Sequence, residues 1–233
     1  MKLSIIIPIY NEKNTLEELI RKVEDVKLEN IEKEIIMIDD CSTDGTRDIL
    51  KKWEGRYEII HKDQNEGKGS AVVSGLQKAS GDMVIIQDAD LEYDPNEYQF
   101  VLEPILAKRA DVVYGSRFLT HRPHRVFHFW HSIGNRFLTL LSNMFTDLTL
   151  TDMETCYKAF NRKALDRVKN RITSKRFGIE PEITALFAKN KDLVVYEVGI
   201  SYYGRTYAEG KKINWKDGFS AIWCIIKFNL FRK

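Results

Sequence analysis

The sequence predicts an α/β protein built on a mostly parallel sheet with helices on both faces. Five short apolar runs recur in the first half of the chain, with helical patterns between them, at residues 3–7, 34–38, 57–60, 83–86 and 111–114. Runs this short and this continuously apolar are typical of strands that are buried on both faces. The chain has 233 residues and contains neither an internal repeat nor a low-complexity linker. We therefore expect residues 1–233 to form a single domain.

The balance of charges and the cysteines exclude several classes of protein. The chain has 36 Lys and Arg residues against 34 Asp and Glu residues, a formal net charge of +2. A dedicated nucleic-acid binder carries a concentrated basic excess, so we expect no nucleic acid as a partner. The three cysteines, Cys41, Cys156 and Cys224, are far apart and lack CxxC spacing. Their pattern fits neither a disulfide framework nor a zinc ribbon and favours a reducing compartment, the cytoplasm.

The first helical pattern follows Asn14. Thr15 and Glu18 have the spacing of a capping box, and the apolar residues at positions 16, 19, 20 and 23 share one helix face. Later patterns predict helices at 162–168 and 180–189 and strands at 157–160 and 193–200. We expect these last two strands to extend or flank the main sheet.

Two amphipathic segments lie in the second half of the chain, at residues 126–145 and 215–231. In each, large apolar residues recur at helical spacing, among them Trp130 and Phe137 in the first and Trp223 and Phe228 in the second. Such a helix either docks on the core or lies in a membrane interface, and the pattern fits both. No run reaches the ~18 apolar residues that a spanning helix needs, so we expect no membrane crossing.

Polar residues follow the predicted strands, where an open α/β sheet binds its ligands. The first strand is followed by Pro8-Ile-Tyr-Asn-Glu12, the second by Asp39-Asp-Cys-Ser-Thr-Asp-Gly45, and the fourth by Gln87-Asp-Ala-Asp-Leu-Glu92. The fifth ends in Gly115-Ser-Arg117. These residues are the first candidates for a site.

Asp88 and Asp90 flank one small residue, so an extended chain points both carboxylates to the same side. Mg²⁺ and Mn²⁺ typically take one or two carboxylates and complete their shell with water and phosphate oxygens. Glu92, two residues further on, can join such a set. An isolated Asp-x-Asp in a loop often caps the next helix instead, so the pair alone leaves both interpretations open.

The segment Asn65-Glu-Gly-Lys-Gly-Ser70 precedes a helical pattern. Backbone N–H groups at a helix start can bind phosphate, which makes Lys68 a candidate nucleotide-binding residue. A tight turn with a helix cap fits the spacing about as well, because the full P-loop spacing is absent.

In their order and spacing these segments resemble family 2 inverting glycosyltransferases. The segments are 4–12, 38–45, 65–69, 88–90 and 115–117, and the likeness is greatest to the branch with dolichyl-phosphate mannose and glucose synthases. The resemblance implies a GT-A type nucleotide-diphospho-sugar transferase fold with a Rossmann-like, mostly parallel sheet. Residues 1–118 would then be the nucleotide-sugar-binding half, and residues 119–233 the acceptor-binding half.

The resemblance also implies roles for single residues. The nucleotide pocket would be lined by Pro8, Tyr10 and Glu12, with Asp39 or Asp40 accepting a hydrogen bond from the base. Asp88, Asp90 and Glu92 match the segment that holds the donor diphosphate through Mg²⁺ or Mn²⁺, and Asp90 would be catalytic in this way. Arg117 and Arg205 match arginines that bind the acceptor phosphate.

The sequence departs from the mannose synthases at two places. Glu92 stands where those enzymes commonly have Gln, which makes the expected metal shell more acidic. Residues 152–157 read Asp-Met-Glu-Thr-Cys-Tyr, where several relatives read Asp-Pro-x-Ser-Gly-Phe. The resemblance therefore does not carry mannose specificity to this chain.

The chemistry of the acceptor decides which further residues are needed. A phosphate monoester has a second pKa of ~6 and is dianionic at neutral pH, so it needs no general base. It needs cations instead, and arginines grip phosphate in a bidentate manner; the candidates are Arg117, Arg122, Arg125 and Arg205. A hydroxyl acceptor would need a base, for which Asp152 is the first catalytic candidate, with Glu154 beside it.

We therefore expect an inverting, metal-dependent enzyme that moves a sugar from a UDP- or GDP-sugar to a polyprenyl phosphate, dolichyl or undecaprenyl. It would act at the cytoplasmic membrane face as a peripheral protein. The first alternative is an enzyme of the same fold that acts on a saccharide hydroxyl in envelope or capsule polysaccharide synthesis. A second is a nucleotide-sugar sensor without turnover, which the Asp88 and Asp90 pair disfavours because a binder needs no leaving-group catalyst.

Overall fold

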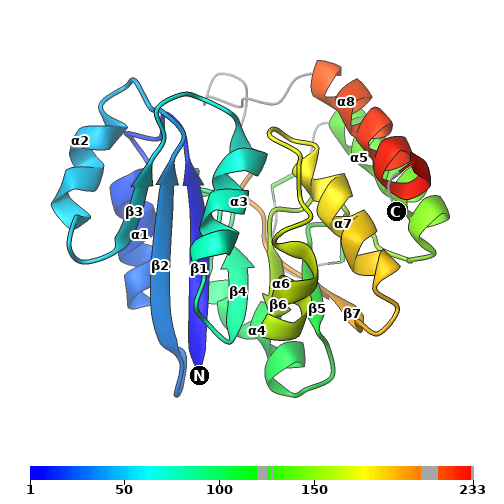
Figure 1. The fold of residues 1–233 in the computed structure, drawn as a ribbon, viewed down its shortest axis with the longest axis horizontal. Coiled ribbons are helices and arrows are strands. Elements are labelled where there is room, and N and C mark those ends of the chain that lie inside the picture. The colour runs from blue at the N-terminus through cyan, green and yellow to red at the C-terminus, as the bar shows by residue number, and fades with distance from the viewer. Residues whose placement is uncertain (120–124, 127–128, 206–214, 232–233) are drawn as a thin grey trace.

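The computed structural model describes residues 1–119, 125–126, 129–205 and 215–231, and its centre is one seven-stranded sheet (Figure 1). The strand order is β3-β2-β1-β4-β6-β5-β7. In chain order the elements are β1 (Lys2–Ile9), α1 (Leu16–Asp25), β2 (Glu32–Asp39), α2 (Thr46–Leu50), a 3-10 turn (Lys51–Trp53), β3 (Glu58–His61), α3 (Lys68–Lys78), β4 (Met83–Ile86), a second 3-10 turn (Pro95–Glu97), α4 (Tyr98–Leu106), β5 (Val112–Ser116), α5 (Phe129–Thr146), β6 (Lys158–Asn161), α6 (Arg162–Val168), α7 (Ile179–Lys189), β7 (Val195–Gly199), α8 (Trp215–Ile226) and a π-helical turn (Lys227–Phe231).

The sheet confirms the predicted mostly parallel α/β class. Strands β3, β2, β1 and β4 are mutually parallel, and β7 is parallel to β5 at the far edge. The expectation that both late strands would extend or flank the sheet holds for β7 and is wrong for β6. That strand lies inside the sheet, antiparallel to both β4 and β5. A short buried strand has the same apolar pattern in either direction, so its sequence does not reveal its place.

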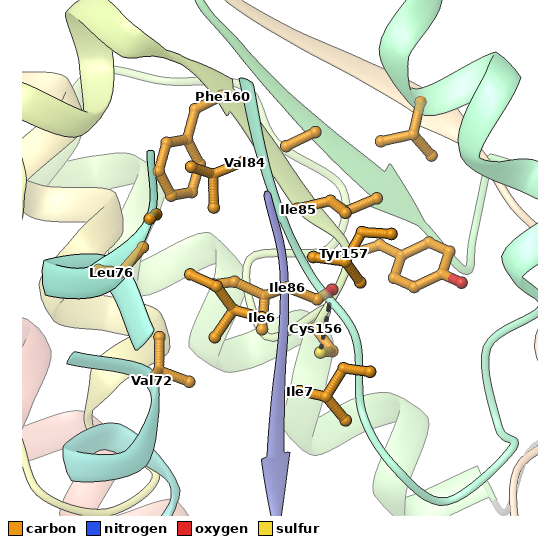
Figure 2. Packing of buried hydrophobic residues seen from close by; sticks show 14 of the residues in the cluster. Ile6, Ile7, Val72, Leu76, Val84, Ile85, Ile86, Cys156, Tyr157 and Phe160 are labelled. Carbon is orange, nitrogen blue, oxygen red and sulfur yellow. Dashed lines mark hydrogen bonds between the residues drawn. The ribbon is translucent and has the colours of Figure 1, made fainter. Parts of the chain in front are cut away.

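The core includes buried residues of α1, α3, α4, α6 and α7 as well as of the sheet, and part of it lies between the sheet and α3. Every residue of β1 from Leu3 to Ile9 is buried, which is why this strand reads as one continuous apolar run. Figure 2 shows Ile6 of β1 beside Val72 and Leu76 of α3. Helix α3 approaches the sheet closely because its Gly75 has no side chain: an added Cβ would lie 2.5 Å from Ile6 Cγ2.

A crevice opens where the order of the strands reverses. The chain runs from β1 outward to β2 and β3 and then returns to β4 on the other side of β1. Strand β1 pairs with β2 as far as Ile9 but with β4 only as far as Ile6. Pro8, which has no N–H, lies beyond the last residue paired with β4, where a missing donor costs little. Such a switch point is where open α/β sheets bind ligands.

Helix α1 begins at Leu16 as predicted, but the predicted capping box is wrong. Thr15 makes no side-chain cap to the helix. Its hydroxyl lies 2.9 Å from Glu12 Oε2 and 2.8 Å from the Ala89 carbonyl oxygen. The residue therefore joins the loop after β1 to the loop after β4, at the crevice.

The first amphipathic segment forms α5, which packs with α7 and α8 beside the sheet (Figure 1). Helix α5 buries the small polar residues Thr139, Ser142 and Thr146 and packs the half-buried Leu138 and Leu141 against the core, whereas most of its other large apolar side chains are exposed. Trp130 is 78% exposed and Met144 is 74% exposed.

The second amphipathic segment forms α8, which buries Ala221 and Ile225 and leaves Phe219 and Trp223 exposed. Together, α5 and α8 present an outward apolar face. It comprises Trp130, Ile133, Phe137, Leu140, Met144, Phe145, Phe219 and Trp223. Among the described residues, none of the helices combines the length and apolar character that crossing a bilayer requires.

The close approach of α3 to the sheet gives a test of the packing. An alanine usually stabilises a helix relative to glycine, but at Gly75 the added methyl would meet Ile6 and Ile38 Cδ1, the latter at 2.8 Å. We expect Gly75→Ala to lower the free energy of unfolding by ~1–3 kcal/mol. The exposed Gly134 of α5, with open space around its Cα, is the matched control, where alanine should add ~0.5–1 kcal/mol. Urea unfolding measures both, and equal effects would contradict this packing.

Candidate active site

The crevice contains a cleft of about 370 Å³ at the carboxyl ends of the strands. Loops after β1, β2, β4 and β5 reach it, together with the first residues of α3 and α7. Of the residues predicted from the sequence, it is lined by Pro8, Tyr10, Glu12, Asp40, Lys68, Asp88, Asp90, Glu92, Arg117 and Arg205. The structure thus brings together residues that lie almost 200 positions apart in the chain.

Two predicted residues do not line the cleft, and the first is Asp39. Its side chain is fully buried, and Oδ2 lies 2.6 Å from Arg47 Nε while Oδ1 accepts a hydrogen bond from the Ser42 amide. Asp40 does line the cleft, but its carboxylate accepts the backbone N–H groups of Glu66 at 3.0 Å and Gly67 at 2.6 Å. In this structure both aspartates organise the loops that follow β2 and β3.

Arg205 lies at the centre of an acidic group formed by Glu12, Asp90 and Glu92. Its Nη2 is 2.9 Å from Asp90 Oδ2, and its Nη1 is 3.4 Å from Glu12 Oε2. Its backbone N–H and Nε both approach Glu92 Oε1. The residue predicted to bind the acceptor phosphate therefore pairs here with the residues predicted to bind metal.

Asp88, the first aspartate of the Asp-x-Asp pair, pairs with Lys68, whereas Asp90 pairs with Arg205. Lys68 Nζ lies 2.9 Å from Asp88 Oδ1 and 3.0 Å from Glu180 Oε1. Burial and the neighbouring carboxylates of Asp88 and Glu92 raise the pKa of Asp90 to about 7. The site therefore holds more negative charge than Arg205 and Lys68 neutralise.

These residues fit a divalent cation. Within the described part of the chain, no three His, Cys, Asp or Glu side chains already form a metal-binding group. Magnesium-type sites on nucleotides need fewer protein ligands, because one or two carboxylates suffice beside the phosphates. Asp88 and Asp90 line the same cleft, and the raised pKa of Asp90 shows that this position favours an added positive charge.

Arg117 and Asp152 form a buried bidentate ion pair. Arg117 Nε lies 2.6 Å from Asp152 Oδ2, and Nη2 lies 2.7 Å from Oδ1. Asp152 is the other predicted residue that does not line the cleft; it is fully buried and also accepts a hydrogen bond from Asn135 of α5. Although burial alone would raise it, the pKa of Asp152 is lowered by the guanidinium of Arg117. Asp152 thus holds Arg117 in place at the wall of the cleft.

The other two candidate arginines contribute less. Arg122 lies outside the described residues. Arg125 is exposed, donates a hydrogen bond to the Gly204 carbonyl oxygen at 2.8 Å, and does not line the cleft.

Several lining residues were not singled out by the sequence. They are Tyr93, Arg176, Phe177, Glu180 and Tyr202. The one sequence signal for Glu180 was a carboxylate in a helical pattern that is mostly apolar. In the structure the residues of this helix from Ile179 to Phe187 are all buried, and a glutamate is seldom buried without a partner. Glu154, considered only as a base for a hydroxyl acceptor, also lines the cleft.

The architecture is similar to that of an enzyme whose structure has been solved. Glucosyl-3-phosphoglycerate synthase from Mycobacterium tuberculosis, in complex with Mn²⁺, uridine diphosphate and phosphoglyceric acid, superposes with a TM-score of 0.73 at 17% identity. The match covers 99% of this chain and 78% of that one. The fold is therefore of the GT-A glycosyltransferase type, as predicted.

The family follows from the sequence itself. Residues 4–169 match the model of glycosyl transferase family 2, and the chain belongs to this family of glycosyltransferases. It is 25% identical to the UDP-N-acetylglucosamine--dolichyl-phosphate N-acetylglucosaminyltransferase of Methanococcus voltae over 97% of this chain and 95% of that protein. It is 36% identical to the dolichol-phosphate mannosyltransferase of Pyrococcus furiosus, over 51% of this chain and 34% of that longer protein.

The buried carboxyl group of Glu154 gives a test of the site's electrostatics. Burial and the nearby carboxylate of Glu180 raise the pKa of Glu154 to about 8. A raised pKa stabilises the fold at low pH, and this contribution is lost as the pH rises through about 8. We expect the wild type to lose more stability than Glu154→Gln between pH 5 and pH 8, by at least ~1 kcal/mol in urea unfolding. Glu103→Gln, at an exposed site, should keep the wild-type pH slope; the same slope in Glu154→Gln would contradict the raised pKa.

Proposed function

We propose that this glycosyltransferase moves a sugar from a UDP- or GDP-sugar to a polyprenyl phosphate, with inversion at the anomeric carbon. The proposal is carried by one observation: a single cleft holds the Asp88 and Asp90 carboxylates together with the ion-paired Arg117. The relatives from Methanococcus and Pyrococcus, whose names give dolichyl phosphate and dolichol phosphate as acceptors, support it.

The donor would bind with its base toward Pro8 and Tyr10 and its diphosphate toward Asp88 and Asp90. When bound there, Mg²⁺ or Mn²⁺ supplies Lewis-acid stabilisation of the charge that develops on the leaving nucleoside diphosphate. Lys68, 2.9 Å from Asp88, lies on the same side as a further cation. Nearby carboxylates stabilise the oxocarbenium character of the reacting sugar, as in glycosidases.

The acceptor side favours a phosphate over a hydroxyl. A dianionic phosphate needs positioning by cations and no proton acceptor, and Arg117 is held ready by Asp152. A hydroxyl acceptor would need a base. Both oxygens of Asp152, the first candidate for that base, are bound by Arg117, so this carboxylate is not free to accept a proton.

The outward apolar face of α5 and α8 suits a protein that works on a lipid. Trp130 is 78% exposed and Trp223 is 59% exposed. Exposed aromatic side chains of this size are typical of a helix that lies in a membrane interface. We therefore place the enzyme peripherally at the cytoplasmic membrane face, with this apolar face against the bilayer.

The reaction is tested with a panel of UDP- and GDP-sugars, Mn²⁺, and a short polyprenyl phosphate present or absent. We expect glycolipid product with lipid phosphate only, and a loss of at least ~100-fold in Asp90→Asn, because Lewis-acid stabilisation of a leaving group is worth several kcal/mol. Asp166→Asn on α6, which removes an exposed carboxylate paired with Lys169, is the control and should keep full activity. Turnover on soluble sugars without lipid phosphate would contradict the proposed acceptor.

Membrane association is tested by flotation with vesicles of phosphatidylcholine and phosphatidylglycerol. We expect Trp130→Ser combined with Trp223→Ser to weaken binding at least ~10-fold, because each large apolar side chain contributes up to ~1.5–3 kcal/mol when buried in lipid. Val194→Ser, at an exposed apolar position beside β7, is the matched control and should bind like the wild type. Equal flotation of all three proteins would contradict a membrane role for α5 and α8.

A further inference from the structure

Two carboxyl oxygens in the cleft have no partner within the described part of the chain. Glu180 is only 6% exposed, and while its Oε1 lies 3.0 Å from Lys68 Nζ, its Oε2 has no hydrogen bond. Glu154 Oε1 is likewise buried and without a hydrogen bond. Leaving a buried acceptor unsatisfied is costly, so such a group in a binding cleft indicates a ligand that donates to it.

Their place in the fold shows which part of a donor they would meet. Glu154 lies in the loop before β6, and Glu180 lies in the first turn of α7. The strand order runs from β2 and β1, where Pro8, Tyr10 and Asp40 line the cleft, through β4 with Asp88 and Asp90, to β6. A nucleotide sugar that runs in this direction has its base first, its diphosphate next and its sugar last.

The chemistry of the two glutamates points the same way. Glu180 shares the single ammonium of Lys68 with Asp88, and the negative charge that remains repels a phosphate, so neither the diphosphate nor the acceptor phosphate is expected beside it. The groups on a nucleotide sugar that donate hydrogen bonds beyond its diphosphate are the hydroxyls of the sugar ring. Lys68 contacts Asp88 with the same Nζ that contacts Glu180, so it joins the diphosphate side of the cleft to the glutamate side.

We propose that Glu154 and Glu180 form the subsite for the donor sugar, bind its hydroxyl groups, and restrict the donor to uncharged sugars. This inference rests on the proposed function, because it requires a nucleotide-sugar donor in the cleft. It adds a substrate class: neutral hydroxylated sugars are accepted, and sugars that carry a carboxylate, the uronic acids, are rejected by like charge. The two glutamates would be specificity residues rather than the source of the leaving-group chemistry.

The subsite is tested by binding rather than by turnover. Calorimetric titration with Mn²⁺ compares UDP with UDP-glucose and UDP-N-acetylglucosamine, and GDP with GDP-mannose. We expect Glu180→Gln to weaken the preferred sugar nucleotide at least ~10-fold, since a hydrogen bond to a charged group is lost, while the matching nucleoside diphosphate changes less than ~2-fold. Glu154→Leu, which removes both oxygens of this carboxyl group, should show the same pattern, and Glu103→Gln, at a residue that does not line the cleft, should change neither affinity.

The outcomes separate this inference from the proposed function. If the wild type binds none of these nucleotides, the proposed function and the subsite both fail. If the wild type binds them but the glutamate variants weaken the diphosphate and the sugar nucleotide equally, or weaken neither, only the subsite is overturned.

A second measurement uses the wild type alone and so does not depend on whether a variant folds. The uronate form of the preferred sugar nucleotide, UDP-glucuronate or GDP-mannuronate, competes with it for the protein. We expect the uronate to bind at least ~10-fold more weakly than the neutral sugar nucleotide, because its carboxylate would approach Glu180. Equal affinities would overturn the restriction to uncharged sugars.

Discussion

The ion pair between Arg117 and Asp152 is the interaction on which the site's architecture depends. It joins the end of β5 to the loop before β6, and Asn135 adds α5 to the same carboxylate. Glu197 of β7 accepts the backbone N–H groups of Thr151 and Asp152 at 3.0 Å, so the far edge of the sheet also supports this point. Breaking a buried ion pair is strongly destabilising, and a guanidinium that is already fixed by two hydrogen bonds to one carboxylate loses little further freedom when it binds a ligand.

The remaining charges of the cleft are arranged around this fixed arginine. Glu12, Asp90 and Glu92 share the single guanidinium of Arg205, and Asp88 and Glu180 share the ammonium of Lys68. In each group the carboxylates outnumber the cation, and burial together with the neighbouring carboxylates of Asp88 and Glu92 raises the pKa of Asp90 to about 7. The excess of carboxylates in the cleft attracts cations, whereas the guanidinium of Arg117 attracts anions. Such a division of charge suits two substrates in one cleft: a donor with a metal-bound diphosphate and an acceptor with a phosphate.

The α/β framework and most residues of the cleft could be predicted from the sequence, because both follow from local patterns along the chain. Continuous apolar runs identify buried strands, and polar residues after them lie at one sheet edge. The direction of β6 was not predictable, since its apolar run is symmetric. The partners of Asp39 and Asp152 could not be predicted either. Spacing shows that a carboxylate lies at the sheet edge, but it does not show that Asp39 pairs with Arg47 and Asp152 with Arg117, so that neither side chain lines the cleft. Glu180 was missed because it comes from a distant helix.

Helix α5 shows why amphipathic spacing alone leaves the function open. The periodicity predicts one apolar face, but only the fold shows that this face is outward and that Thr139, Ser142 and Thr146 pack inward. On the inward side the same helix places Asn135 Nδ2 2.9 Å from Asp152. One element therefore carries both the proposed membrane contact and a hydrogen bond to the carboxylate that fixes Arg117. The proposed acceptor has a lipid chain, which would meet the apolar face, and a phosphate head, which would meet Arg117. Helix α5 would therefore fix the position of the membrane-facing surface relative to Arg117.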